Sequence, residues 1–244
     1  MKIGVQLYTL REECEDDFFG VLEKVAKLGY DGVEFAGFFG KTAEEVKECL
    51  EKNNLEVVGS HTSLDLLKNH LAEVITYNKE IGNDVIICPY SEVKDEQSKD
   101  ELVPFLIKVG KILKENSMKF LYHNHDHEFI EVNSKPILEY ILHDTENFVS
   151  SELDTFWIFR ADRNPVEYME YLGDKLELVH IKDGNKDEIL SVGAGEVDIK
   201  SIVNQAKKMG LKWIVVENDN PSPTGMEDIT RSINYLKSIG ADKL

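Results

Sequence analysis

The chain has 244 residues, of which 42% are hydrophobic and 30% are charged, and its formal charge is −18. This length suits one large domain or two small ones, and the composition is that of a globular protein with a sizeable core. Nucleic acid and anionic membrane surfaces are expected to be poor partners, because 46 acidic residues outnumber 28 basic ones and no basic tract is present.

The N-terminal segment and the cysteines bear on the compartment. The opening MKIGVQLYTL does not have the pattern of a signal peptide, and no apolar run approaches the ~18 residues of a membrane span. Cys14, Cys49 and Cys88 are far apart and form no CxxC pair. That usage is typical of a reducing compartment and disfavours a disulfide scaffold or a zinc ribbon. We therefore expect a cytoplasmic protein with no membrane partner.

Short β-branched segments alternate along the chain with amphipathic segments of helical period. The expected strands cover residues 2–7, 32–36, 55–61, 84–89, 119–125, 149–154, 176–182 and 213–218. The expected helices between them include residues 16–29, 43–54, 101–116 and 228–240. Several helical segments end at Gly or Asn just before the next strand, as in KLGYDG and EKNNLE, which is the chemistry of a helix C-terminus.

Eight strands alternating with helices predict an α/β fold, a (β/α)8 TIM barrel. A doubly wound open sheet is the alternative, but it normally has a glycine-rich turn after the first strand, and VQLYTLREE has none. No linker or composition shift divides the chain, so a single domain is expected over residues 1–244.

In such a barrel, functional groups lie where the strands end and the βα loops begin. Several expected strands run apolar and then finish on His, Asp or Glu, with GVEFAG, GSHTS, YHNHDHEF, ELDTFW, VHIKDG and VVENDN as the relevant segments. Three of the seven histidines lie within YHNHDHEF alone. Because parallel strands end at the same mouth of a barrel, these side chains are expected to converge.

A mixed set of carboxylates and imidazoles suits a transition-metal ion and is too rich in nitrogen for a dedicated Ca²⁺ site. We expect a divalent ion such as Mn²⁺, Co²⁺ or Zn²⁺. Asp154, His180 and Glu217 are the firmest ligands, because each is the first ionisable group after its apolar strand. The fourth ligand is expected to be Glu128, with His123 as the alternative.

The remaining polar and aromatic residues near the strand ends are expected to bind substrate. They are Glu34, His61, His123, His125, Trp157 and Lys182. Trp157 and Phe156 could stack on a sugar face or belong to the core, and His127 is expected to be exposed.

Ordinary structural roles are open for some of these positions. Asp154 could cap a helix, and Glu217 could form a loop salt bridge. VGAGEVD, residues 192–198, is a weak phosphate-binding signal, because it has neither a preceding strand nor the lysine of a P-loop. It is better interpreted as a flexible loop in which Asp198 caps the next helix.

The strand ends, together with GVQLYTLR, LGYDGVEF and HIKDG…GAGEVD, resemble the xylose-isomerase-like TIM barrels of the sugar (phosphate) isomerase/epimerase superfamily. The resemblance covers essentially the whole chain. It implies a Glu/Asp/His/Glu metal site formed by strand five, Asp154, His180 and Glu217. The chain departs from many ketose 3-epimerases, with His123-Asn124 in place of a Glu-Pro pair and Trp157 in place of a His. Its tandem histidines resemble those of inosose dehydratases, and some relatives act on 3-keto-glycosides.

The function expected first is a metal-dependent sugar isomerase or epimerase, in which Glu128, Glu217 and His125 move a proton through a metal-stabilised enediolate of a keto-sugar. An inosose-type dehydratase, or a lyase or hydrolase of keto-glycosides, is the alternative on the same site. The acidic charge of the chain disfavours an endonuclease IV-like repair enzyme. The near-complete set of metal ligands disfavours a sugar-binding barrel without catalytic activity. The expected partner is a small carbohydrate, and pairing of barrel helices into a homo-oligomer is left open.

Overall fold

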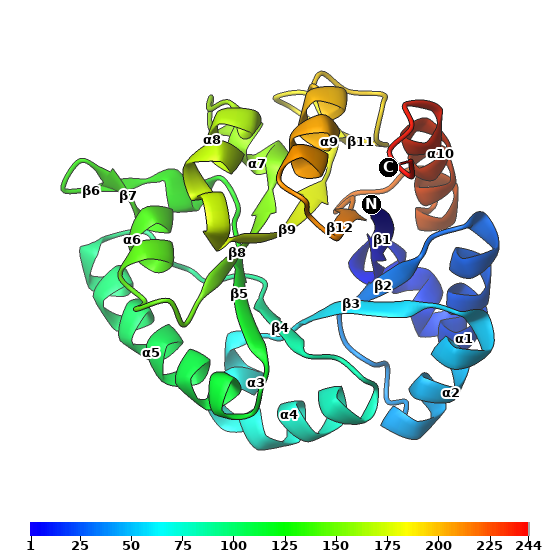
Figure 1. Cartoon of the computed structure of the whole chain (residues 1–244), viewed down its shortest axis with the longest axis horizontal. Helices are drawn as coiled ribbons and strands as arrows, with labels where there is room; N and C mark the ends of the chain where they lie inside the picture. The colour runs from blue at the N-terminus through cyan, green and yellow to red at the C-terminus, as the bar shows by residue number, and fades with distance from the viewer. Residues whose placement is uncertain (244) are drawn as a thin grey trace.

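Eight parallel strands close into a barrel in the computed structural model, which describes residues 1–243 (Figure 1). The barrel strands are β1 (Lys2–Gln6), β2 (Gly32–Phe35), β3 (Glu56–His61), β4 (Val85–Cys88), β5 (Lys119–His123), β8 (Ser150–Asp154), β9 (Leu176–Ile181) and β12 (Trp213–Val216). Each strand pairs with the barrel strand before and after it in the chain, and β12 closes the ring on β1. The predicted (β/α)8 barrel is confirmed, and all eight predicted strands are present.

Helices surround the barrel and connect its strands. They are α1 (Arg11–Leu28), α2 (Ala43–Asn53), α3 (Leu64–Asn69), α4 (Leu71–Glu80), α5 (Glu96–Glu115), α6 (Ile137–His143), α7 (Thr155–Arg160), α8 (Pro165–Leu172), α9 (Ile199–Lys208) and α10 (Gly225–Ser238). The hairpins β6 (Glu131–Val132)/β7 (Lys135–Pro136) and β10 (Asp183–Gly184)/β11 (Ile189–Leu190) lie outside the barrel sheet.

Helix ends follow local capping chemistry. Helix α5 begins earlier than predicted because the Asp95 side chain accepts a hydrogen bond from the Ser98 N–H. Helix α10 also begins earlier than predicted, and there the Thr224 side chain accepts a hydrogen bond from the Glu227 N–H. The predicted C-terminal residues of α1 and α2 are correct: Gly29 and Asn54 have φ of 86° and 53°. Their left-handed backbone ends each helix and directs the chain into the next strand.

Two apolar clusters hold the barrel together. The larger lies between the strands and the helices, and the smaller fills the barrel interior with Val58, Ile87, Leu121, Leu178, Trp213 and Val215. Each fully buried side chain of this kind contributes about 1.5–3 kcal/mol. The rest of the barrel interior is available to the polar residues at the carboxyl ends of the strands.

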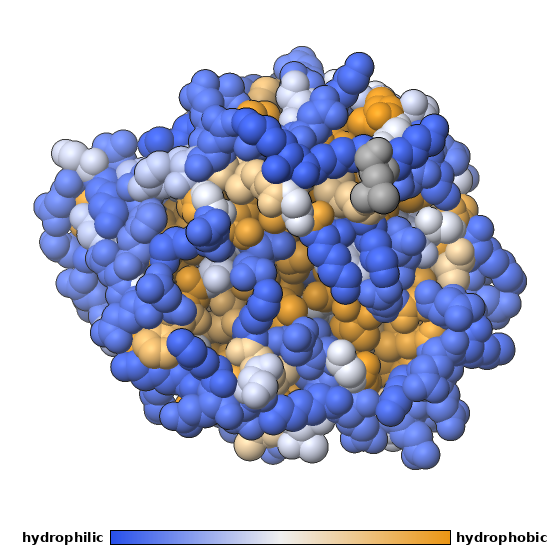
Figure 2. Space-filling view, viewed as in Figure 1, coloured by the Kyte–Doolittle hydropathy of each residue, from blue (hydrophilic) through white to orange (hydrophobic). Residues whose placement is uncertain are grey.

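Hydrophilic residues dominate the periphery of the face shown in Figure 2, and hydrophobic residues are visible mainly toward its centre. Across residues 1–243, no helix combines the length and the apolar character needed to cross a membrane.

Candidate functional site

The carboxyl ends of the barrel strands bring together most of the ionisable side chains that the sequence indicated. They are Glu34 on β2, His61 on β3, His123 on β5, Asp154 on β8, His180 on β9, Lys182 just after β9 and Glu217 just after β12. The His61 side chain is 9% exposed and the others are almost completely buried. Burying this many ionisable groups is costly unless they pair with each other or bind an ion, so their convergence calls for a chemical explanation.

Glu152 on β8 also reaches this cluster, and the sequence-based prediction left it out. Residues two apart in a strand face the same side, so Glu152 and Asp154 both face the barrel interior. Both are fully buried. The period-two alternation in SSELD places Glu152 on the same face as Asp154 and could have predicted it. The prediction considered only the ionisable residue at the end of each strand, which in this strand is Asp154.

The potential ligand atoms fall into two groups that share two imidazoles. The Asp154 group consists of His123, Asp154, His180 and Glu217, and the Glu152 group of His61, His123, Glu152 and His180. In each group, one ligand atom per residue lies within 4.8 Å of all the others. Either group therefore has the dimensions of a site for one metal ion.

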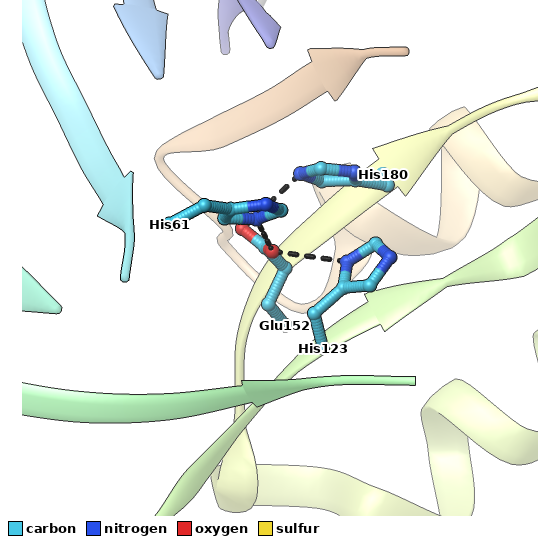
Figure 3. Close-up of side chains that lie close together, drawn as sticks. All are labelled: His61, His123, Glu152 and His180. Carbon is cyan, nitrogen blue, oxygen red and sulfur yellow. Dashed lines mark hydrogen bonds and ion pairs between the residues drawn. The ribbon is translucent and has the colours of Figure 1, made fainter. Parts of the chain in front are cut away.

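Three imidazoles surround the carboxylate of Glu152 (Figure 3). Its Oε2 is 2.7 Å from His61 Nε2 and 3.1 Å from His123 Nδ1, and its Oε1 is 3.2 Å from His180 Nε2. Glu34 supports the same cluster, with its Oε2 2.8 Å from His180 Nε2. Burial lowers the pKa of His61, but Glu34 and Glu152 outweigh this effect and raise the pKa to about 10. Without a metal ion, protonated imidazole therefore supplies positive charge here.

Asp154 has two roles, one for each oxygen. Its Oδ1 caps α7 by accepting hydrogen bonds from the N–H groups of Phe156 at 2.9 Å and Trp157 at 3.3 Å. Its Oδ2 lies 3.0 Å from the Lys182 ammonium. Burial raises the pKa of Asp154 to about 6, although Lys182 opposes the shift. Helix capping thus accounts for one oxygen and leaves the other directed into the site.

The Lys182 ammonium lies among three carboxylates. Its Nζ is 3.0 Å from Asp154 Oδ2, 2.9 Å from Glu217 Oε2 and 2.9 Å from Asp219 Oδ2. Burial lowers the pKa of Lys182, but these carboxylates raise it well above its ordinary value. The lysine is therefore charged, and its position shows where the site accommodates a cation. Asp219 was not among the predicted site residues.

Glu128, the expected fourth ligand, is not brought together with the Asp154 group. Strand β5 ends at His123, and the chain then turns into a short 3-10 helix, so the strand alternation no longer directs Glu128 toward the barrel axis. Its carboxylate accepts hydrogen bonds from Tyr122 Oη and the His125 N–H, both at 2.8 Å. His123, the alternative, occupies the strand-five position in the group. Glu128 instead holds the loop that carries His125.

His127 was expected to be exposed, but its side chain is 23% exposed and its Nε2 lies 2.8 Å from the carbonyl oxygen of Ser91. With His125 and Glu128 it forms a third close cluster. Both Glu128 oxygens already accept hydrogen bonds, one from Tyr122 Oη and one from the His125 N–H. We therefore interpret this third cluster as a support for the loop conformation.

A cavity of about 480 Å³ opens beside the ionisable cluster. Its lining includes Tyr8, Gly37, His61, Leu66, Tyr90, His123, His125, Glu217 and Asp219. An adjacent hollow of about 670 Å³ shares Ser63, Pro89 and Tyr90 with it. The first volume is in the range that accommodates a small organic ligand, and its polar groups converge at one side.

The two aromatic residues that could either contact substrate or belong to the core differ in burial. Phe156 is fully buried in the core. Trp157 is half-buried, with its ring centroid 5.3 Å from that of His125 and 5.3 Å from the Lys182 Nζ. Burial lowers the pKa of His125 to about 2, so this imidazole is neutral at ordinary pH. A neutral imidazole can donate and accept hydrogen bonds, which suits the substrate contact proposed for it.

The glycine loop of residues 192–198 surrounds a carboxylate of the protein itself. The Asp183 side chain accepts hydrogen bonds from the N–H groups of Gly193, Gly195 and Val197 at 2.8, 3.0 and 3.1 Å. A Cβ on Gly195 would lie 2.2 Å from Asp183 Oδ1, so only glycine fits there. Asp198 caps α9 as predicted. The loop thus fixes the segment that carries His180 and Lys182.

The donor set and the charge balance both fit a divalent cation. Two imidazoles and two carboxylates form the Asp154 group, a mixture that suits Zn²⁺, Co²⁺ or Mn²⁺. Within residues 1–243, the buried oxygens Glu34 Oε1, Glu152 Oε1 and Asp154 Oδ2 accept no hydrogen bond, although Glu152 Oε1 lies 3.2 Å from His180 Nε2 and Asp154 Oδ2 lies 3.0 Å from Lys182 Nζ. Buried carboxylate oxygens of this kind favour a neighbouring cation, and the Lys182 ammonium takes that place beside Asp154.

Comparisons with known proteins agree with this architecture. Residues 22–239 match the family model described as xylose isomerase-like TIM barrel. The chain is 23% identical to an inosose dehydratase of Clostridium tetani, over 93% of this chain and 91% of that protein.

Solved structures share the fold. A sugar phosphate isomerase/epimerase from Parabacteroides distasonis superposes with a TM-score of 0.85 at 23% identity, covering 99% of this chain and 96% of that one. The IOLI protein, solved with a zinc atom, superposes with a TM-score of 0.77 at 16% identity, covering 100% and 99% of the two chains.

Proposed function

The chain belongs to the xylose isomerase-like TIM barrel family, and from that premise we propose that it is a divalent-metal-dependent enzyme that removes a proton next to the ketone of a cyclic polyol or sugar. The outcome we propose is dehydration, with a keto-cyclitol as the substrate class. The observation that carries the proposal is the buried Asp154 group at the edge of a cavity that Glu217 and Asp219 line.

The residues that would hold the ion are His123, Asp154, His180 and Glu217. When bound, a divalent ion supplies Lewis-acid polarisation of the substrate carbonyl and of a neighbouring hydroxyl. The zinc in the IOLI protein, which has the same fold, is consistent with such a group in this barrel.

Glu217 is the group proposed to take the proton. Burial raises its pKa, but Lys182 and His180 outweigh burial and lower the pKa well below its ordinary value. Glu217 is therefore ionised, and it lines the cavity. The Lys182 Nζ lies 2.9 Å from Glu217 Oε2. It is therefore close enough to donate a hydrogen bond to a substrate oxygen that lies beside Glu217. The Lys182 ammonium would then stabilise negative charge that develops on a substrate oxygen.

The chemistry of dehydration balances on these groups. The α C–H bond breaks and its proton goes to the Glu217 carboxylate, and the electron pair forms a C=C bond as the β-hydroxyl leaves as water with the proton that this carboxylate returns. The product enol, which has a hydroxyl on the former α-carbon, becomes a diketone by proton transfer. One ionised base beside the α-carbon and one proton donor beside the leaving hydroxyl are sufficient.

Isomerisation or epimerisation, the function expected first from the sequence, is the second candidate. Epimerisation requires a proton-transfer group on each face of the substrate. Glu128 is held away by Tyr122 and the loop backbone, and burial lowers the pKa of His123 and His125. The carboxylates that line the cavity, Glu217 and Asp219, both follow strand β12. This one-sided arrangement disfavours epimerisation. The Clostridium tetani relative named inosose dehydratase favours dehydration over isomerisation, which needs a proton-transfer group on one face only.

The experiment incubates Mn²⁺- or Co²⁺-loaded protein with inososes and ketoses in D₂O. Dehydration predicts an ultraviolet-absorbing unsaturated or dicarbonyl product from an inosose, whereas epimerisation or isomerisation predicts a new sugar that carries carbon-bound deuterium. Glu217→Gln is expected to lower the rate by about 10²–10⁴-fold. Glu177→Gln, on an exposed salt bridge to Lys119 on the barrel surface, is the matched control and should leave it unchanged. Absence of proton exchange and of product across the panel would refute the proposal.

A further inference from the structure

The two imidazoles that belong to both ligand groups have their two ring nitrogens directed to opposite sides. His123 Nδ1 lies 3.1 Å from Glu152 Oε2, and its Nε2 lies 3.7 Å from Asp154 Oδ2. His180 Nε2 lies 2.8 Å from Glu34 Oε2, and its Nδ1 lies 3.0 Å from Glu217 Oε2. Each ring therefore bridges the two groups and makes a different contact with each.

A neutral imidazole has one N–H and one lone pair, so it can donate a hydrogen bond on one side and ligate a metal on the other. Ligating histidines usually donate their second N–H to a carboxylate, which fixes the tautomer and the ring orientation. Sharing His123 and His180 therefore means that one group holds the ion and the other supplies the acceptors.

Three observations place the ion in the Asp154 group. The Lys182 ammonium already lies between Asp154 Oδ2 and Glu217 Oε2, at 3.0 and 2.9 Å, and marks a position suited to a cation. Lys182 also contacts Asp219, so it has a carboxylate partner left when an ion binds the other two. Of the carboxylates in the two groups, Glu217 lines the cavity where a substrate would reach the ion, and Glu152 does not.

The donors around the Glu152 carboxylate are imidazoles, and Lys182 is not among them. His61 Nε2 lies 2.7 Å from Glu152 Oε2 and 3.1 Å from Glu34 Oε2. Gln6 holds Glu34 in turn, because its Nε2 donates to Glu34 Oε2 at 2.6 Å. The two carboxylates are thus fixed by β1 and β3 before any ion binds.

We propose that Glu152 and Glu34 are positioning residues of the metal centre: they accept the N–H groups of His123 Nδ1 and His180 Nε2, and so direct His123 Nε2 and His180 Nδ1 to the ion. This inference rests on the proposed metal centre and adds a specific ligand atom for each histidine. Glu152 was absent from the expected ligand set, and this role explains why a carboxylate is buried among three imidazoles.

The test uses full-length protein with ¹⁵N-labelled histidine, loaded with ¹¹³Cd²⁺. Scalar coupling between ¹¹³Cd and ¹⁵N identifies the ligating nitrogens, and comparison with His61→Asn assigns the His61 ring. We expect two coupled rings, His123 through Nε2 and His180 through Nδ1, with the second nitrogen of each ring protonated. Coupling through His123 Nδ1, His180 Nε2 or any His61 nitrogen would place the ion in the Glu152 group and overturn the inference.

Variants then test the carboxylate itself. Glu152→Gln keeps the shape of the side chain but weakens it as an acceptor, so Cd²⁺ affinity should fall about 10–100-fold. The ¹⁵N shifts of His123 should show a change in tautomer. Glu177→Gln, on neighbouring β9, is the control and should change neither quantity. Unchanged affinity and tautomers in Glu152→Gln would contradict the positioning role. Failure of the unsubstituted protein to bind Cd²⁺ would overturn the metal centre itself, a result distinct from ligation through the wrong nitrogens.

Discussion

Replacing Lys182 with Met tests whether the lysine and a metal ion share the same carboxylates. Met has a similar length and keeps the packing, but it removes the ammonium from Asp154, Glu217 and Asp219. Without an ion, the buried Asp154 and Glu217 and the partly buried Asp219 would then lack their lysine partner. With an ion bound to Asp154 and Glu217, the charge would be largely compensated. The variant should therefore be damaged far more in the metal-free state.

The expected magnitude follows from the burial of the group. Removing one partner of a buried ion pair costs about 3–5 kcal/mol. For a domain of this size, each kcal/mol lowers the melting temperature by about 2–4 °C, so the metal-free variant should melt roughly 6–20 °C lower. Metal affinity should rise, because two unit charges 4 Å apart repel by about 4 kcal/mol at an effective dielectric constant of ~20. Relief of even a third of that repulsion gives about tenfold tighter binding.

Calorimetric melting with chelator and with Zn²⁺, together with competitive Zn²⁺ titration, measures both effects. Lys186→Met is the matched control, because Lys186 lies in the same loop and pairs with exposed Asp162, an interaction worth about 1 kcal/mol at most. Equal destabilisation with and without metal, or weaker metal binding by the Lys182→Met protein, would refute the idea that the ammonium occupies a cation position.

Three further predictions test other parts of the site. Asp154→Ala should abolish bound metal, measured as metal per chain after purification without chelator, and full retention would contradict its role as a ligand. His61→Asn should alter the pH dependence of metal-free stability: because the folded pKa of His61 is raised to about 10, its stabilising contribution is complete below about pH 6.5 and is lost as the pH rises through 10. Urea unfolding of both proteins at pH 7 and pH 10 should therefore show a difference that shrinks at the higher pH, and a constant difference would exclude this account. Gly195→Ala should destabilise the protein by about 1–3 kcal/mol, because the new Cβ would lie 2.2 Å from Asp183 Oδ1, and an unchanged unfolding midpoint would show that the loop adapts.

The barrel was predictable because its information is local and repeated. Most strands are short apolar runs, many of them rich in β-branched residues, and helices such as α1 and α2 have an apolar face and a recognisable end at Gly29 or Asn54. The convergence of Asp154, His180 and Glu217 also followed from the sequence, since parallel strands in a closed barrel must end at the same mouth. None of these steps requires knowledge of which side chains touch.

The exact partners required the tertiary structure. Whether Glu128 or His123 reaches the site depends on where β5 ends and how the following loop turns, and Tyr122 decides this by holding Glu128 with a hydrogen bond.

The sequence alone therefore determined the barrel, the mouth at which its polar residues gather and the chemical character of that mouth. Only the tertiary structure decided that Glu152 lies among the imidazoles and that the Lys182 ammonium contacts three carboxylates. It also decided that His123 and His180 each direct one ring nitrogen to the Asp154 group and the other to the Glu152 side of the cluster. The physical reason is that strand periodicity fixes the face from which a side chain projects, whereas a contact between two side chains depends on the relative placement of strands far apart in the chain.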